Sequence, residues 1–260
     1  MRPILFEFFN IKIYTYGFFM AIAFLMGLIF IKREAARYGE SPEKMGDLTF
    51  YIIIFGLIGA RLFYIITDLK AYLLHPLEIF KIWNGGLTFY GGFIAAFFTT
   101  VIYLKKHRMS LLKTMDIMAP GVALGHFFGR IGCFFAGCCY GKECNLPWSV
   151  IFTNTDTLAP ANVHLHPTQL YSSLNNLIIF LILLLIRKYK KFTGEIFLIY
   201  IFLYGITRSI VETFRGDYRG HVFFNHISIS QIIGTSAAFI ALIAFIYMRR
   251  KSGKRLISKF

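Results

Sequence analysis

Residues 48–67 read LTFYIIIFGLIGARLFYIIT, a stretch of 20 residues in which Arg61 is the one charged side chain. A helix needs about 20 predominantly apolar residues to cross the hydrocarbon core of a bilayer. Six further stretches have the same character, so the predicted spans are residues 13–31, 48–67, 87–104, 115–139, 168–186, 194–213 and 227–248. The sequence therefore predicts an all-α integral membrane protein with about seven transmembrane helices.

The composition agrees with this fold class. Hydrophobic residues make up 57% of the chain and charged residues 16%, whereas about 25% of an ordinary soluble domain is charged. The mean hydropathy is +0.60. These values exclude a disordered chain, a collagen-like fibre and a disulfide scaffold, and they leave too little polar surface for a soluble globular domain. We expect a single polytopic membrane domain over residues 1–260.

The positive charges predict the orientation in the membrane. The formal net charge is +15, and most Lys and Arg residues lie in four short clusters, at 32–44, 105–113, 187–191 and 249–259. The positive-inside rule assigns these clusters to the cytoplasm. The sequence therefore predicts an external N-terminus, a cytoplasmic C-terminus and a small extracytoplasmic head that includes the longer loops 68–86 and 140–167. Clusters of this kind indicate contact with anionic lipid and no nucleic-acid partner.

Charged residues inside predicted spans are costly in lipid and therefore need a reason. Arg208 is followed by Glu212 one helical turn later, and Tyr204 and Arg215 continue the same polar stripe. One interpretation is an internal ion pair that only neutralises itself. The other is the cationic wall of a cavity for a lipid headgroup, with Glu212 holding Arg208 in position.

Arg130 follows Gly121, Gly125 and Gly129, which recur every four residues and predict a helix face that a neighbouring helix approaches closely. No carboxylate lies within a helical turn of Arg130. Its planar guanidinium predicts a bound phosphate, and the alternative is an arginine that extends to the outer interface. Arg61, with small residues nearby, is expected to be structural.

The four cysteines are Cys133, Cys138, Cys139 and Cys144. Their spacing fits neither a zinc site built from two C-x2–4-C pairs nor a redox C-x-x-C motif. The adjacent Cys138 and Cys139 are expected to point to different helix faces. We therefore expect the thiols mainly to pack, and we expect no metal and no cofactor. A metal or redox site and an outer-loop disulfide are the alternatives.

Two further motifs lie where predicted spans begin. The sequence 83–92, WNGGLTFYGG, contains two Gly pairs whose exposed amides would suit a headgroup phosphate, but a tight helix entry beside an interfacial Trp explains it equally well. His166 precedes Pro167 at the start of the fifth span. It is either a ligand contact or an interfacial polar residue.

Taken together and in order, these motifs resemble the prolipoprotein diacylglyceryl transferases of bacteria over nearly the whole chain. The motifs that carry the resemblance are Tyr16-Gly17, Gly59-Ala60-Arg61, Gly85-Gly86-Leu87-Thr88-Phe89-Tyr90-Gly91-Gly92, Gly129-Arg130-Ile131-Gly132 through Gly141, His166-Pro167-Thr168-Gln169-Leu170-Tyr171, and Tyr204-Gly205 with Arg208, Glu212, Arg215 and Asp217.

The resemblance implies a multi-pass protein of the bacterial cell (inner) membrane. It would transfer the diacylglyceryl group of phosphatidylglycerol to the lipobox Cys of prolipoprotein signal peptides, with a thioether formed and glycerol phosphate released. It also implies the site residues. Arg130, Arg208 and Tyr90 would be catalytic, and substrate would contact Arg130, Tyr16, Gly91, Gly141, His166, Tyr204 and Glu212.

The chain departs from the family pattern at five positions. Asn is usual at the positions of Cys133 and Ala136, Glu at those of Cys138 and Ser172, and His at that of Tyr90. These departures leave headgroup binding intact and the identity of a general base open. An anion or lipid transporter and a membrane thiol oxidoreductase built on the cysteines are the other function classes.

Overall fold

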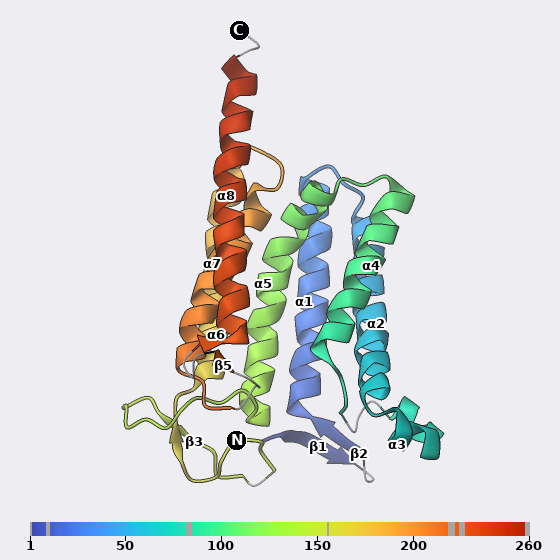
Figure 1. Ribbon diagram of the computed structural model, residues 1–260, viewed down its shortest axis with the longest axis vertical. Helices are drawn as coiled ribbons and strands as arrows, with labels where there is room; N and C mark the ends of the chain where they lie inside the picture. Colours follow the sequence, from blue (N-terminus) through green and yellow to red (C-terminus); the bar gives the residue numbers. More distant parts are fainter. Residues whose placement is uncertain are drawn as a thin grey trace. The chain divides into compact units, whose positions relative to one another are not determined.

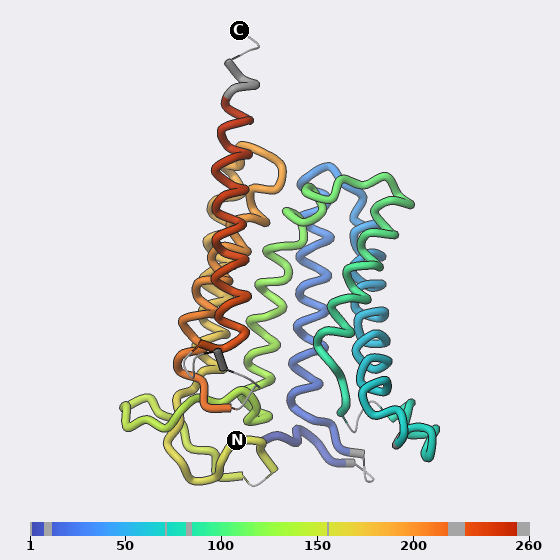
Figure 2. The backbone as a smooth tube through the Cα atoms, viewed as in Figure 1, coloured from blue at the N-terminus to red at the C-terminus, as the bar shows by residue number. Residues whose placement is uncertain are grey.

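The computed structural model describes residues 2–8, 11–81, 85–154, 156–217, 222–223 and 227–257; the other residues are grey in Figure 2. The first two residues of the 83–92 motif, Trp83 and Asn84, fall outside the described residues, as does Arg219.

Each predicted span overlaps one long helix in the described part of the chain. The long helices are α1 (Thr15–Arg37), α2 (Pro42–Thr67), α4 (Phe89–His107), α5 (Leu111–Ala136), α6 (Thr168–Ile186), α7 (Glu195–Thr213) and α8 (Ile229–Ile257). Six of them, all but α4, are long and apolar enough to cross a membrane. The predicted class of all-α multi-pass membrane protein is confirmed.

The short elements connect these helices. Two antiparallel strands, β1 (Ile4–Phe8) and β2 (Ile11–Tyr14), precede α1. A short helix α3 (Leu69–Leu74) and a 3₁₀ turn η1 (Pro76–Phe80) follow α2, and η3 (Arg187–Tyr189) follows α6. Two further antiparallel pairs are β3 (Val150–Ile151) with β4 (His164–Leu165), and β5 (Val222–Phe223) with β6 (Ile227–Ser228).

Large apolar side chains are exposed along the helices. On α8, Phe239 and Ile240 are 64% and 66% exposed, and on α2, Phe50 and Leu62 are 55% and 53% exposed. Exposed apolar surface of this extent is unfavourable in water. It is suited to lipid chains, which explains why helices without a clear polar face are stable here.

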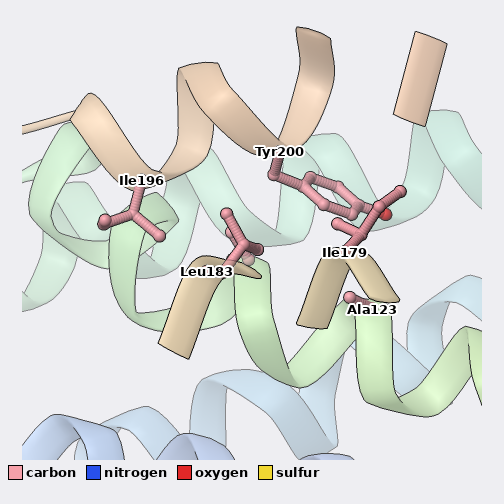
Figure 3. Close-up of a cluster of buried hydrophobic side chains, with 6 residues drawn as sticks. Ala123, Ile179, Leu183, Ile196 and Tyr200 are labelled. Carbon is pink, nitrogen blue, oxygen red and sulfur yellow. The ribbon is translucent and has the colours of Figure 1, made fainter. Parts of the chain in front are cut away.

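The chain divides into two compact units, residues 1–30 with 115–260 and residues 31–114. In the first unit α5, α6, α7 and α8 run alongside one another (Figure 1). Their shared core is a cluster of buried side chains from α5, α6 and α7, namely Ala119, Ala123, Ile179, Leu183, Ile196 and Tyr200 (Figure 3).

A buried carboxylate fixes the start of α7. Asp116 on α5 is 1% exposed and accepts backbone hydrogen bonds from Gly194 at 2.6 Å and Phe197 at 2.9 Å. Its Oδ2 also lies 2.8 Å from Nζ of Lys190. The amides of Gly194 and Phe197 are among those left unpaired at a helix N-terminus, where a negative charge is favourable.

In the second unit α2 packs closely on α4. A Cβ on Gly91 would lie 2.3 Å from Cβ of Phe63 and 2.4 Å from the carbonyl oxygen of Gly59, so glycine is required at this crossing. Arg61, 7% exposed, donates to carbonyl oxygens of the 78–86 segment, including those of Glu78 at 2.5 Å and Gly85 at 2.7 Å. The predicted structural role of Arg61 is confirmed.

Candidate active site

The predicted polar stripe is present on α7 as far as Glu212, whereas α7 ends at Thr213 and Arg215 lies beyond the helix. The guanidinium of Arg208 is paired with the carboxylate of Glu212, and Nε of Arg215 lies 3.8 Å from the same carboxylate. The side chains of Arg208 and Glu212 are 13% and 6% exposed. Glu212 is therefore shared between two arginines, which is more than an isolated self-neutralising pair.

Arg215 is held from the opposite direction by Asp217. Nε and Nη2 of Arg215 each donate to one carboxylate oxygen of Asp217 at 2.8 Å. The same guanidinium hydrogen bonds the sulfur of Cys139. Burial alone would lower the pKa of Arg215, but the hydrogen bonds to Asp217 and Cys139 raise that pKa above its usual range. Arg215 therefore stays cationic.

Arg130 approaches this group from α5. It lies within electrostatic range of Tyr204, Cys133, Cys139 and Arg215. It forms no salt bridge with any residue that the structure describes. A half-buried guanidinium without a carboxylate is costly unless an anion accompanies it.

The predicted glycine face brings α5 against α1 in this unit. A Cβ on Gly125 would lie 3.5 Å from the carbonyl oxygen of Ala23, and a Cβ on Gly27 would lie 3.4 Å from that of Gly121. This approach explains how Tyr16, at the start of α1, comes within electrostatic range of Arg130 and of Cys133.

Three backbone segments meet beside Arg215. The amide of Gly141 donates to the carbonyl of His166 at 3.0 Å, that of Lys142 to Phe214 at 2.8 Å, and that of Gly216 to Tyr140 at 3.1 Å. A Cβ on Gly141 would lie 2.5 Å from the Cβ and carbonyl oxygen of His166. Gly141 is therefore a glycine because the segments approach so closely.

His166 faces aromatic neighbours in this junction. Its ring centroid is 5.2 Å from that of Phe214, and its Nδ1 lies 3.2 Å from the hydroxyl of Tyr171. Trp148 donates to the same hydroxyl at 2.7 Å. These contacts hold the imidazole of His166 against Phe214, which follows α7 and directly precedes Arg215.

Three of the four cysteines lie together in the structure. The sulfurs of Cys133, Cys138 and Cys139 are within 4.8 Å of one another. The inference that Cys138 and Cys139 point to different helix faces is wrong, because α5 ends at Ala136 and does not continue to 139. Gly137 and Cys139 have left-handed backbone conformations, with φ of 71° and 63°, and these turn the chain.

The predicted site residues divide between the two units. The first unit contains Tyr16, Arg130, Gly141, His166, Tyr204, Arg208 and Glu212. Tyr90 and Gly91 belong to the second unit, where Tyr90 is 58% exposed and Gly91 packs on α2. The sequence did not indicate that the cysteines would lie beside Arg130 and Arg215.

The charge balance of the cluster favours an anionic ligand. Three arginines (130, 208 and 215) accompany two carboxylates (212 and 217) among the described residues of the cluster. Guanidinium groups bind phosphate through two parallel hydrogen bonds. The arrangement is therefore suited to a phosphate group at the end of the membrane span of α5.

Comparison with known proteins agrees with this chemistry. The family model described as prolipoprotein diacylglyceryl transferase matches residues 3–247. A phosphatidylglycerol–prolipoprotein diacylglyceryl transferase of Clostridium tetani is 42% identical over 94% of this chain and 97% of its own length. Relatives with the corresponding name in Clostridium perfringens and Finegoldia magna are 38% and 33% identical, over 85% and 99% of this chain and 86% and 98% of their own lengths. The chain therefore belongs to the prolipoprotein diacylglyceryl transferase family.

Proposed function

We propose that this chain transfers the diacylglyceryl group of phosphatidylglycerol to the lipobox Cys of prolipoproteins, forming a thioether and releasing glycerol phosphate. The family match and the names of the relatives support the reaction. The observation that carries the site assignment is Arg130, which lies beside the Arg208–Glu212–Arg215 group without a described carboxylate of its own.

In this reaction Arg130 binds the phosphate of the lipid headgroup. The acceptor sulfur attacks the glyceryl carbon, a sulfur–carbon bond forms, and the carbon–oxygen bond to phosphate breaks. The electron pair leaves with the phosphate, so negative charge grows there in the transition state. Fixed cationic donors at that position stabilise the charge without reorganisation.

Glu212 positions the other two arginines. Its carboxylate is nearly inaccessible and is held between Arg208 and Arg215. Because this carboxylate is paired with both guanidinium groups, it is poorly suited to act as a general base. We assign Glu212 and Tyr204 to support of the phosphate site, and Tyr16, Gly141 and His166 to the binding of substrate. Tyr90 and Gly91 are assigned to the same reaction from the resemblance.

We propose the inner membrane as the location, with the N-terminus external and the C-terminus cytoplasmic. The basic clusters at 32–44, 105–113, 187–191 and 249–259 support this orientation. The phosphate site would then face the outer leaflet, which phosphatidylglycerol reaches by lateral movement. A transporter and a thiol oxidoreductase are not favoured, since the relatives are named as transferases.

The direct test is transfer of a labelled diacylglyceryl group from phosphatidylglycerol to a lipobox peptide by the purified full chain. Thioether product and stoichiometric glycerol phosphate are expected. A peptide with Ser in place of the lipobox Cys is the control and should not be modified. Absence of product from correctly inserted protein would exclude the proposed function.

A further inference from the structure

Three half-buried thiols converge at the end of α5, beside the arginines of the phosphate site. The sulfurs of Cys133, Cys138 and Cys139 lie within 4.8 Å of one another, and Cys144 is outside this group. Cys139 hydrogen bonds Arg215, and Cys133 and Cys139 are both within electrostatic range of Arg130. The proposed phosphate site and the thiol cluster are therefore neighbours.

The backbone around these thiols is held in a strained conformation. Cys139 has a φ of 63°, which is uncommon for a residue other than glycine. The side chain of Gln169 donates to the carbonyl of Cys138 at 2.8 Å, and Thr168 Oγ1 donates to that of Cys139 at 2.7 Å. Both donors are at most 1% exposed. Strain that is supported from the surroundings is typical of functional sites.

We propose that Cys133, Cys138 and Cys139 hold a zinc ion, and that the open fourth position of this zinc binds the acceptor thiol of the prolipoprotein. The proposal rests on the transferase function proposed above and assigns that site a metal. It replaces our expectation, from the sequence alone, that no metal takes part.

The distances suit this assignment. Zinc–thiolate bonds of about 2.3 Å in a tetrahedron place sulfurs about 3.8 Å apart. The three sulfurs are already within 4.8 Å of one another, so small side-chain rotations complete the site. No His, Asp or Glu of the described residues joins the three cysteines as a fourth ligand. Three protein ligands with one open position are the pattern of catalytic zinc sites, whereas structural sites are closed.

The charges around the three cysteines also suit a zinc ion. Zinc with three thiolates carries one negative charge, and a fourth thiolate from the acceptor adds another. Arg130 and Arg215 lie next to the cluster and offset this charge. Arg130 also binds the headgroup phosphate in the function proposed above, so the nucleophile and the leaving group would be held beside each other.

The step is balanced without a redox partner. The acceptor thiol loses its proton to water on binding zinc, since a coordinated thiol is present as thiolate. The zinc-bound sulfur displaces phosphate from the glyceryl carbon, and the neutral thioether that forms is a weaker ligand and dissociates. A free thiol with a pKa near 8.5 is only about 3% ionised at pH 7, so coordination raises the thiolate population about 30-fold. This supplies the nucleophile without a side-chain base.

The experiment measures bound metal and transfer in the same preparations. The full chain, purified in detergent with zinc present, is assayed for zinc content before and after a chelator and after zinc is returned. About one zinc per chain is expected in the wild-type protein, and transfer at pH 7 should fall about 30-fold on chelation and recover with zinc. Cys133→Ser, Cys138→Ser and Cys139→Ser should lose zinc, whereas the matched control Cys144→Ser should keep both zinc and activity.

A second measurement reports on the open position. Cobalt(II) is substituted for zinc, and the thiolate-to-cobalt absorption is recorded while a lipobox peptide is added. A Cys peptide should increase the absorption by one further thiolate, and a Ser peptide should not. Because this readout uses the wild-type chain, it does not depend on the folding of any variant.

The possible outcomes separate the two proposals. Active wild-type protein that contains no zinc, or whose transfer rate is unchanged by chelation, would overturn the zinc site and leave the transferase function standing. A thiol titration that finds two fewer free thiols in protein purified without a reductant would show a disulfide in place of the zinc site. Protein that binds zinc and the Cys peptide but makes no thioether would contradict the transferase function instead.

Discussion

Arg208 and Glu212 are paired one helical turn apart on α7, with side chains only 13% and 6% exposed. Arg215, three residues beyond Glu212, lies 3.8 Å from the same carboxylate. One carboxylate thus orients two guanidinium groups toward the end of the span. Removing either member of such a pair leaves a charge without its partner in a poorly hydrated place.

Arg208→Ala should therefore lose both stability and activity. We expect a destabilisation of about 3–5 kcal/mol, because Glu212 loses its nearest cation. The double variant Arg208→Ala with Glu212→Ala should recover part of the stability and none of the activity. Thermal melting in detergent and the transfer assay give the two quantities. Full activity in the double variant would show that the pair is only structural.

Gly141→Ala should disturb the junction that places Arg215. The new Cβ would lie 2.5 Å from the backbone oxygen of His166, and backbone cannot move aside cheaply. We expect the free energy of unfolding to fall by about 1–3 kcal/mol and the transfer rate to fall as well. The control is Gly253→Ala in α8, where a Cβ meets no atom within 4 Å. Equal behaviour of the two variants would argue against a close junction at Gly141.

Asp116→Ala should separate folding from chemistry. Asp116 on α5 accepts hydrogen bonds from two backbone amides at the start of α7 and pairs with Lys190, and the core cluster includes Ala123 of α5 and Ile196 of α7. We expect a destabilisation of about 3–5 kcal/mol with normal activity per folded molecule. The melting temperature reports the stability, and active-site titration gives the activity per folded molecule. A selective loss of turnover at unchanged stability would be inconsistent with this role.

The orientation is tested by reporters fused to the full chain. The basic clusters predict that a reporter after Phe260 is active in the cytoplasm and that one inserted within 140–167 is active outside. Activity of the C-terminal reporter outside the cell would reverse the assignment and place the phosphate site at the inner leaflet.

The sequence was most informative where one physical requirement dominates. Six of the seven predicted spans overlap helices that are long and apolar enough to cross a membrane, because these two properties decide insertion; the span 87–104 overlaps α4, which is not among them. The predicted start at 48 marks the apolar part of α2, whereas the helix begins at Pro42, where Ser41 accepts a hydrogen bond from the Lys44 amide. Capping extends a helix beyond the part that hydropathy identifies.

The cysteine cluster was less accessible to sequence analysis. Its spacing matches no common motif, and the convergence of Cys133 with Cys138 and Cys139 depends on the end of α5 at Ala136 and on a left-handed Cys139. The Gly at 137 is a signal for a helix end. Nothing local to the sequence indicates that Cys139 adopts a conformation which residues with a side chain rarely adopt.

In the proposed reaction, Arg130 binds the headgroup phosphate and stabilises its charge as the bond to carbon breaks. Single-turnover transfer from phosphatidylglycerol to a lipobox peptide, measured at saturating lipid, tests it most directly. Arg130→Ala should lower the transfer rate about 10²–10³-fold, and Arg130→Lys should also lose most of the rate because it keeps the charge but not the planar fork. A rate within twofold of wild type for Arg130→Ala, in correctly inserted protein, would contradict the account.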